Sequence, residues 1–465
     1  MTRIAGALVG LLLAAGSLPA AAQNSGQPAP APVPKPTPRS AERPAERPAE
    51  QAPVTSDTPA ALPDVLGRLL TLPEVIQIAL VTQPQIQSRL YDYAAARFRV
   101  DEAIAPLLPQ LSATWTATRD RLIFGVSSTA PTMFATQNAV RLALSQVLFD
   151  FGKNFAATEV AKRLADVAKE DVEVQRDLIV LAVKQAYFNL LFGQRLIVVN
   201  LAALKRADLN LRSARGFYEV GTQPKLAVSR AEVDVANAKV ALIQARNAEQ
   251  LARVALDTGM GIPVTTPIHI VDILSEHPPY QFDHPGLLAE ALRGRPEYKQ
   301  AKLRVDAAEA TVKLQVRNFY PDITGNAFVG RQTTDFREIW ELGVALNWNI
   351  FDGGNKIARY REALASLQSA QAQMRSEELT IAQDVEQAYL NVGAADEQIQ
   401  AARAAVAAAD ESFRLAQGRF DAGVGTILEL TDAQLALTQA QSTEAQALAN
   451  FHIALATLER ALGRR

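Results

Sequence analysis

The sequence of 465 residues contains no cysteine and few aromatic residues. The absence of cysteine excludes disulfides, thiolate metal sites, a cysteine nucleophile and lipid attachment at an N-terminal cysteine. Aromatic residues make up 6% of the chain although hydrophobic residues make up 48%. Alanine supplies much of this apolar content, which favours closely packed helices over a bulky globular core. The formal net charge of −2 lacks the basic surplus of nucleic-acid binders, so no nucleic-acid partner is expected.

Recognisable catalytic and cofactor motifs are also missing from the sequence. The four histidines, His269, His277, His284 and His452, do not have the spacing of metal ligands. Gly259-Met260-Gly261 indicates the end of a helix and does not form a phosphate-binding loop. Neither a P-loop nor a nucleophile elbow is present. We therefore predict a protein that is not an enzyme and that binds no metal and no cofactor.

Residues 1–22 have the pattern of a secretory signal peptide. Arg3 precedes an apolar run from Ile4 to Ala15, and small residues at 20–22 predict cleavage after Ala22. The alternative, a membrane anchor, is disfavoured because the run is shorter than the ~20 residues that span a bilayer. We expect no later stretch to be long and apolar enough for a spanning helix, so insertion into a membrane would require strands.

A proline- and alanine-rich segment, residues 23–63, follows the predicted signal peptide. It contains a tandem repeat, AERP followed by AERP, over residues 41–48. Such a composition cannot bury enough apolar surface to fold, so we predict an extended, disordered linker. It is interpreted as a spacer, with contact to the cell wall or to a partner as the alternative.

The rest of the chain repeats itself, which predicts a duplicated unit. Early in the unit the two copies are offset by 212 residues, and from Leu144 onward by 202. We place the first copy at residues 64–262, a proline-rich connection at 263–285 and the second copy at 286–465. The equivalent pairs include Gln83-Pro84 with Arg295-Pro296, Leu144–Gly152 with Leu346–Gly354, Gly221 with Gly423, and Gly261 with Gly463.

Each copy is predicted to contain a helix, two strands, a very long helix, a glycine turn and a returning helix. Apolar and polar residues alternate along the strand segments, as Leu111, Trp115, Trp340 and Leu342 illustrate. Helical apolar spacing without proline predicts the long helices. The predicted strands lie at about 110–121, 138–149, 322–331 and 340–351, and the predicted long helices at about 154–215 and 355–417.

The strand pattern predicts one apolar face and one polar face. A membrane barrel with a water-filled lumen needs both, and Trp340, Trp348 and Phe149 near the strand ends are typical of an interfacial girdle. The alternative is a hairpin packed on a soluble domain. Four strands cannot close a barrel, since about eight is the smallest single-chain number, and open edges in lipid are costly. We therefore predict a mostly α, α+β membrane protein in which several chains share a barrel and the helices form a coaxial periplasmic tube.

Three groups of motifs resemble the TolC family of outer-membrane efflux proteins. They are Leu72–Leu80 followed by Gln83-Pro84, the junctions Phe149–Gly152 and Phe351–Gly354, and the turn Phe420–Ala433. The resemblance covers about Leu72 to Gly463. It implies a homotrimer in outer-membrane lipid, with a twelve-stranded barrel and a periplasmic α-helical barrel. It also implies a periplasmic adaptor and an inner-membrane pump as partners, in a tripartite efflux or type I secretion system.

The same resemblance places Glu429 and Asp432 at the periplasmic aperture. A spacing of three puts both carboxylates on one helix face, and three copies would form negative rings that favour cations. The alternative is an ordinary solvated acidic face. Two positions depart from the family, which often has an arginine at the position of Gly425 and a tyrosine at the position of Phe420.

The turns that end the long helices are predicted to contact the adaptor. These residues are Gly221, Thr222, Gln223 and Pro224 in the first copy, and Gly423, Val424, Gly425 and Thr426 in the second. An alternative function is a periplasmic coiled-coil scaffold without channel activity. The cargo, whether small molecules, metals or proteins, cannot be read from the sequence.

Overall fold

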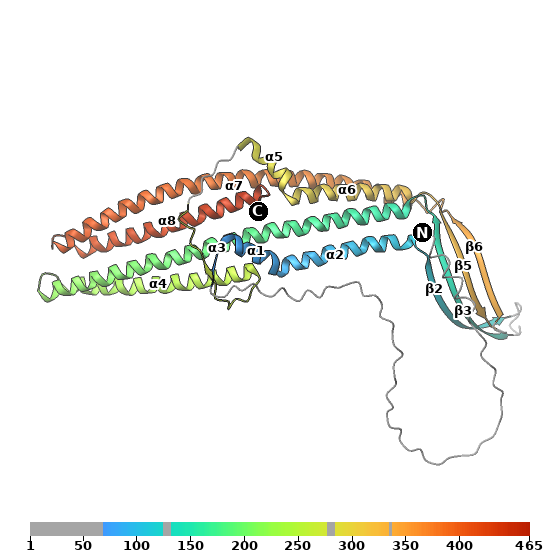
Figure 1. The fold of residues 1–465 in the computed structure, drawn as a ribbon, viewed down its shortest axis with the longest axis horizontal. Coiled ribbons are helices and arrows are strands. Elements are labelled where there is room, and N and C mark those ends of the chain that lie inside the picture. The colour runs from blue at the N-terminus through green and yellow to red at the C-terminus, as the bar shows by residue number, and fades with distance from the viewer. Residues whose placement is uncertain (1–67, 124–131, 277–283, 334–336) are drawn as a thin grey trace, which may run out of the picture. The chain divides into compact units, whose positions relative to one another are not determined.

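The computed structural model describes residues 68–123, 132–276, 284–333 and 337–465, and all of these belong to one unit (Figure 1). The predicted signal peptide, the predicted linker and His277 lie outside the described residues.

The first copy contains the predicted helix, two strands, long helix and returning helix, preceded by a short strand and by a further helix that was not predicted, and interrupted by one helical turn. A capping box between Thr71 and Glu74 begins its first helix, and Pro84 begins the second. The elements are β1 (Leu69–Leu70), α1 (Leu72–Thr82), α2 (Pro84–Ile104), η1 (Ala105–Leu107), β2 (Gln110–Ile123), β3 (Thr132–Phe149), α3 (Lys153–Glu219) and α4 (Lys225–Met260).

The second copy repeats this order. Pro296 begins α6 as Pro84 begins α2, and a left-handed glycine precedes each long helix, Gly152 before α3 and Gly354 before α7. The elements are β4 (His269–Ile270), α5 (His284–Gly294), α6 (Pro296–Arg317), β5 (Asp322–Gln332), β6 (Arg337–Asn347), α7 (Asn355–Asp421) and α8 (Ile427–Ala461).

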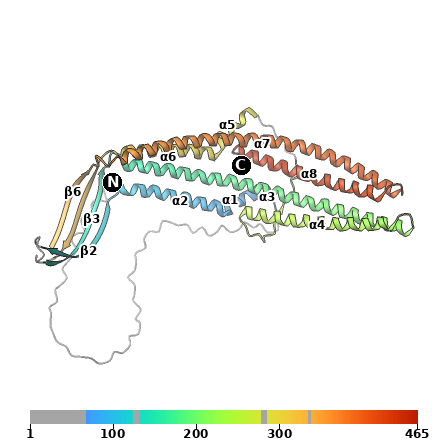
Figure 2. The ribbon, with the colours of Figure 1, turned by 180° about the vertical axis from the view of Figure 1, so that it is seen from behind.

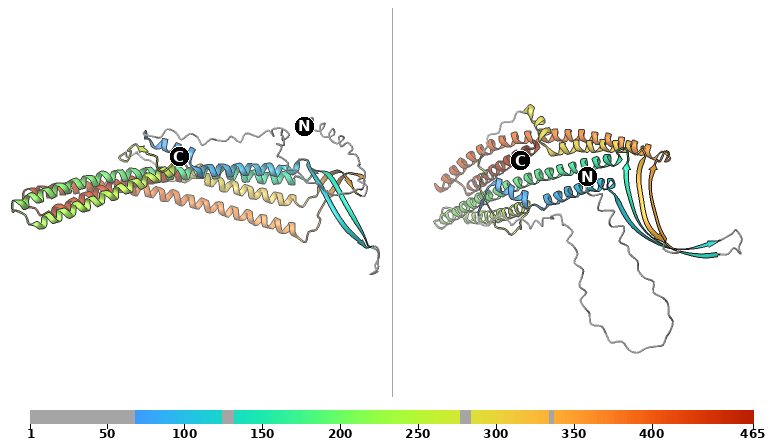
Figure 3. Two further views of the ribbon diagram at one scale, coloured as in Figure 1. Left: turned by 90° about the horizontal axis from the view of Figure 1, so that it is seen from below. Right: turned by 45° about the vertical axis from the view of Figure 1, so that its right-hand side comes forward.

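The four long strands form one antiparallel sheet in the order β2-β3-β5-β6 (Figure 3). This confirms the predicted mostly helical fold with four strands. The end of the last predicted strand, 348–351, is wrong, because β6 stops at Asn347. Asn347 pairs with Asp322, the first residue of β5, so residues beyond it have no strand partner among the described residues. Because apolar and polar residues continue to alternate as far as Ile350, the sequence pattern does not show that the strand ends at Asn347.

The long helices fold back as two hairpins, α3 with α4 and α7 with α8, which contact each other mainly through α3 and α8 (Figures 1 and 2). Both α3 and α7 have 67 residues and are on the order of 100 Å long. On the side of the sheet, α2 packs on α3, α3 on α6, and α6 on α7. Each hairpin tip therefore lies at the opposite end of its long helix from the sheet.

The main apolar core lies where the two copies meet in the middle of the long helices, and it includes residues of α1, α3, α4, α5, α7 and α8. Two glycines at equivalent positions of the copies, Gly261 and Gly463, allow backbone segments to approach each other closely. A Cβ on Gly261 would lie 2.9 Å from Cα of Gln83, and one on Gly463 would lie 2.6 Å from the carbonyl carbon of Gly294. Both glycines also have positive φ, so the duplication preserves the same contact twice.

One expectation about apolar stretches is wrong. By length and composition, α3 contains an 18-residue window that is apolar enough to cross a membrane, although none was expected after the signal peptide. Of that window, 39% is buried against the rest of the structure. The apolar residues of α3 serve its contacts with α2, α4, α6 and α8, which explains why a packed helix passes the same test.

Candidate functional site: the hairpin tips and the sheet

The tip of the second hairpin is fixed by backbone hydrogen bonds and an N-cap. Gly423 has φ 75°, and the Gly425 amide donates to the carbonyl oxygen of Arg419 at 2.8 Å. The hydroxyl of Thr426 accepts a hydrogen bond from the amide of Glu429 at 3.2 Å and so caps α8. This geometry places Glu429 in the first helical turn, directly beside the end of α7.

The two predicted aperture carboxylates are both solvent-exposed on α8. Glu429 lies 3.5 Å from the Nε of Arg419, the last basic residue of α7. Asp432 forms no ion pair within the part of the chain that the structure describes. Sequence reasoning missed Arg419, because a contact across a turn depends on turn geometry and not on helical spacing. Among the described residues the site therefore carries one carboxylate with a nearby arginine and one without an ion-pair partner, both within reach of solvent.

The side chain of Phe420 is fully buried between the two hairpins. Its ring meets that of Phe217 edge-on at 5.5 Å, and it packs with Ala227, Ile427 and Leu430. Phenylalanine at this position therefore contributes apolar packing between α3, α4 and α8. It supplies no hydroxyl for a hydrogen bond.

The position of Gly425 has no room for a side chain. A Cβ there would lie 2.8 Å from the Phe420 amide nitrogen and 2.9 Å from the Arg419 carbonyl carbon, closer than real Cβ atoms approach. An arginine at this position would require the end of α7 to move. The two departures from the family pattern are thus linked, since Gly425 lets the turn close over the backbone beside buried Phe420.

Polar side chains also join the two hairpins, next to the buried cluster of Phe420, Ala227, Ile427 and Leu430. The Thr431 hydroxyl donates to Asp234 Oδ2 at 3.0 Å, and the Asn210 amide donates to Gln434 Oε1 at 2.7 Å. Gln434 in turn donates to the carbonyl oxygen of Ala203 at 3.1 Å. These bonds run from α8 to α3 and α4, so they fix the position of α8 against the first hairpin.

The tip of the first hairpin has a similar turn with different side chains. Gly221 has φ 79°, and the Thr222 hydroxyl donates to the carbonyl oxygen of Phe217 at 2.9 Å. The predicted adaptor-contact residues Gly221, Thr222, Pro224, Gly423, Val424 and Thr426 are exposed, Gln223 is half-buried, and Gly425 is buried. Contact of these turns with an adaptor stays a prediction.

The sheet at the other end of the long helices has two chemically distinct faces. Directly paired residues of antiparallel strands share a face, as Trp115 does with Val140 and Val329 with Trp340. One face exposes large apolar side chains, namely Leu111, Trp115, Val140, Trp340, Leu342, Val344 and Leu346. The other face is mainly polar, with Ser112, Thr114, Thr116, Ser145, Asn326, Glu341 and Asn347.

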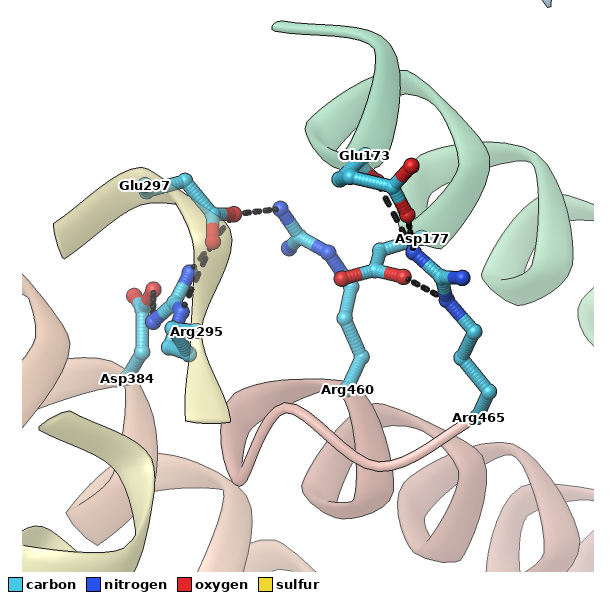
Figure 4. Close-up of polar contacts among 7 residues, drawn as sticks. All are labelled: Glu173, Asp177, Arg295, Glu297, Asp384, Arg460 and Arg465. Atoms are coloured by element: carbon cyan, nitrogen blue, oxygen red, sulfur yellow. Dashed lines mark hydrogen bonds and ion pairs between the residues drawn. The ribbon is translucent and has the colours of Figure 1, made fainter. Parts of the chain in front are cut away.

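An ion-pair network that the sequence did not predict lies in the middle of the helices (Figure 4). Buried Arg295 contacts Glu297 at 3.2 Å and Asp384 at 2.9 Å, and Arg460 contacts Glu297 at 3.1 Å. Burial alone would lower the pKa of Arg295, but the hydrogen bonds and charges of Glu297 and Asp384 raise it. Burial would raise the pKa of Glu297, whereas Arg295 and Arg460 lower it. The network joins α6, α7 and α8.

A separate group of ion pairs near this network anchors Arg465 on α3. It contacts Asp177 at 2.5 Å and Glu173 at 2.6 Å (Figure 4). The repeated X-Pro pairs, Gln83-Pro84 and Arg295-Pro296, mark this region in the sequence. In the first pair, Gln83 donates to the carbonyl oxygens of Thr258 and Gly259 at 3.1 and 2.9 Å. The Gln83-Pro84 and Arg295-Pro296 pairs thus both stand where a returning helix ends.

Asp257, near the end of α4, is a buried carboxylate that forms no ion pair within the described part of the chain. Neither of its oxygens has a hydrogen-bond partner within the described residues. Burial raises its pKa from 3.8 to about 6, against the opposing charge of Arg253.

Among the described residues no group of acidic and histidine side chains could hold a metal ion, and His269, His284 and His452 do not gather in one place.

Comparison with known proteins gives a consistent result. The family model described as outer membrane efflux protein matches residues 75–261 and 287–464, more than half of the chain. The chain is 26% identical over 383 residues to a probable efflux pump outer membrane protein TtgC of Pseudomonas putida, covering 80% of this chain and 78% of the relative. It is 23% identical over 424 residues to outer membrane protein TolC of Escherichia coli, covering 86% and 83%.

Solved structures of the same architecture also match. The outer-membrane channel OprN superposes with a TM-score of 0.74 at 20% identity, covering 91% of this chain and 98% of that one. The open state of the MtrE outer membrane channel of Neisseria gonorrhoeae has a TM-score of 0.69 at 22% identity, covering 84% and 89%. At these identities the likeness establishes the fold.

Proposed function

This chain belongs to the outer membrane efflux protein family, so it is the outer-membrane channel of an efflux system, and we propose that it forms that channel as a homotrimer. In this proposal three four-stranded sheets close one twelve-stranded barrel. The observation that carries it is the sheet itself, which exposes an apolar face, shows a polar face on the other side, and has open edges at β2 and β6.

A shared barrel explains both the exposed apolar face and the open edges of the sheet. Trp115 and Leu342 are 74% and 78% exposed, which is unfavourable in water and favourable against lipid. The edge strands β2 and β6 carry unpaired backbone groups, and each such group in hydrocarbon costs several kcal/mol. Pairing β6 of one copy with β2 of the next removes every edge. The mainly polar face then lines the lumen.

The helical hairpins form the periplasmic part of the proposed channel. Three copies of the long helices would continue the barrel as a tunnel that ends at the tips. We propose that the exposed turns, Gly221–Pro224 and Gly423–Thr426, meet a periplasmic adaptor that couples the channel to an inner-membrane pump. The tips suit this role because they are the parts of the chain farthest along α3 and α7 from the sheet.

The aperture is proposed to lie at the second tip, where Glu429 and Asp432 would form rings of negative charge that favour cations. Their exposure and shared helix face support this role.

Family members are transport channels, and we propose no enzymatic activity for this chain. We further propose that residues 1–22 are removed on export, which N-terminal sequencing of the mature protein checks by a start at Gln23.

The test of the proposal is reconstitution of protein purified from outer membranes. Unheated samples should migrate in gels as a trimer that heating dissociates, and planar bilayers should show discrete conductance steps. A coiled-coil scaffold would instead be extracted without detergent and would give no conductance. Recovery of the chain as a water-soluble periplasmic monomer contradicts the channel proposal.

A further inference from the structure

We propose that a groove between α3 and α6, next to the sheet, binds one glycerophospholipid of the periplasmic leaflet, with its phosphate on Lys313 and Arg317. The proposal rests on the barrel described above, because a bilayer must surround the apolar face of the sheet. It assigns a lipid site to each chain, outside the lumen and outside the aperture.

The groove has a volume of about 590 Å³ and combines apolar and basic side chains. Residues 152–159 at the start of α3 form one wall, and residues 310–320 at the end of α6 form the other. Phe155 is 68% exposed, and Val316 and Tyr320 are exposed as well. An exposed apolar groove of this kind is unfavourable in water and favourable against acyl chains.

The groove opens on the same side as the apolar face of the sheet. Lys153 contacts Asp322 at 2.6 Å, and Asp322 pairs with Asn347 on the polar face, so Lys153 marks the luminal side of α3. Phe155 follows Lys153 by two residues, a rotation of about 200° on an α-helix. It therefore points away from the lumen, toward the side that lipid would occupy.

A row of aromatic rings joins the groove to the sheet. Tyr320 stacks on Phe151 at 5.5 Å, and Phe151 meets Phe149 edge-on at 4.7 Å. Phe149 pairs with Ile323, which shares the apolar face with Leu346. The apolar surface is therefore continuous from the sheet into the groove, which places the groove at the depth of the headgroups in the periplasmic leaflet.

The charges in the groove complement a phosphate. Lys313 and Arg317 are four residues apart on α6, so they share one helix face, and both are exposed. Arg317 Nη1 donates to the carbonyl oxygen of Phe151 at 3.2 Å, which holds the guanidinium in place. The one acid of the groove, Glu159, already accepts from Arg163 Nε at 2.9 Å. Two cations beside an apolar groove at the membrane surface suit a phospholipid headgroup.

The experiment compares lipid binding by purified trimers in native mass spectrometry. Delipidated trimer is titrated with phosphatidylglycerol and, separately, with a diacylglycerol of the same acyl chains, which has no phosphate. The wild type should bind up to three phosphatidylglycerol molecules per trimer and bind the diacylglycerol at least tenfold more weakly. Lys313→Gln/Arg317→Gln should weaken phosphatidylglycerol binding by about thirtyfold, as expected for the loss of two cations at a membrane surface.

A matched control is Lys299→Gln/Lys302→Gln, which removes the same charge from exposed positions of α6 farther from the sheet. Lys302 lies three turns before Lys313 on nearly the same helix face. The control should bind lipid as the wild type does. Equal binding by all three proteins, or equal binding of diacylglycerol, overturns the proposal. Conductance measured on the same preparations separates this outcome from failure of the channel itself, which would remove trimer and conductance together.

Discussion

The two hairpin tips share their backbone and differ in the side chains around it. Gly221 and Gly423 both adopt positive φ at the same step of the duplicated unit. At the offset of 202, however, buried Phe420 corresponds to Tyr218, which is 47% exposed. The acidic residues Glu429 and Asp432 correspond to Ala227 and Arg230, and Gly425 corresponds to Gln223.

This difference indicates that the two copies contribute different side chains to the tips. The first tip keeps the turn and supplies Phe217 and Ala227 as packing surface. The second tip contributes Phe420 as the buried ring and carries the exposed acids. The duplicated fold therefore preserves the glycines that the two turns require and varies the side chains around them, which in the proposed channel would meet cargo, the neighbouring hairpin or a partner. Paired substitutions at equivalent positions test this conclusion.

The largest effect is expected for Phe420→Ala. Truncation of a fully buried phenylalanine costs about 3–5 kcal/mol, and here the loss falls on the contact between the hairpins. The tip should loosen and the channel should conduct more in its resting state. Single-channel conductance, and the susceptibility of cells to a bulky hydrophilic antibiotic, measure the change. Tyr218→Ala is the matched control and should leave both nearly unchanged, so an equal effect of the two variants would contradict the asymmetry.

A second comparison concerns Asp257 and its equivalent Glu459. Glu459 pairs with buried Lys184 at 2.6 Å, whereas Asp257 is buried without a hydrogen-bond partner within the described residues. Because its pKa rises from 3.8 to about 6, the folded state binds more protons than the unfolded chain between those values. Stability should therefore fall as the pH rises through this range and stay lower above it.

Asp257→Asn should remove this pH dependence and raise stability near neutral pH by up to about 3 kcal/mol. Glu459→Gln should do the opposite and destabilise, because it leaves the Lys184 ammonium buried and unpaired. Thermal unfolding of the solubilised trimer at about pH 5 and about pH 7.5 measures both effects. An Asp257→Asn protein that is less stable than the wild type near neutral pH would show that the carboxylate has a partner in solution.

Gly425→Ala should have a smaller effect that is confined to the second tip. Its Cβ would meet the backbone of Arg419 and Phe420, and overpacking of this kind costs about 1–3 kcal/mol. Hydrogen exchange of the amides at residues 419–430 should accelerate, while that of the first tip stays constant. Gln223→Ala is the matched control, since a side chain is already accommodated there. Unchanged exchange in Gly425→Ala would mean that the turn absorbs a Cβ without cost.

The sequence was sufficient to predict the four long strands, the long helices with their returning helices, and the duplication, because these follow from local patterns. The short helices α1 and α5 were not predicted. Alternation along Leu111–Ala117 predicted a strand with two unlike faces, and the glycines at 221 and 423 predicted the turns. The pairing of Arg419 with Glu429, and the network around Arg295, could not be predicted. These contacts depend on how segments far apart in sequence, or on either side of a turn, meet in space. The end of β6 was mistaken for the same reason, since it is set by the length of its partner strand.

The smallest effect on stability, and the sharpest on selectivity, is expected at the acidic pair. The contact between Arg419 and Glu429 is exposed on both sides, so its loss should change stability by less than about 1 kcal/mol. Arg419→Ala should nevertheless increase the preference for cations, because it frees a second carboxylate beside Asp432. Glu429→Ala/Asp432→Ala should decrease that preference severalfold, and Glu219→Ala at the first tip should leave it unchanged. Reversal potentials in planar bilayers under a salt gradient measure the cation preference of all three variants. If Glu219→Ala shifted the reversal potential as much as Glu429→Ala/Asp432→Ala does, the aperture could not be assigned to the second tip.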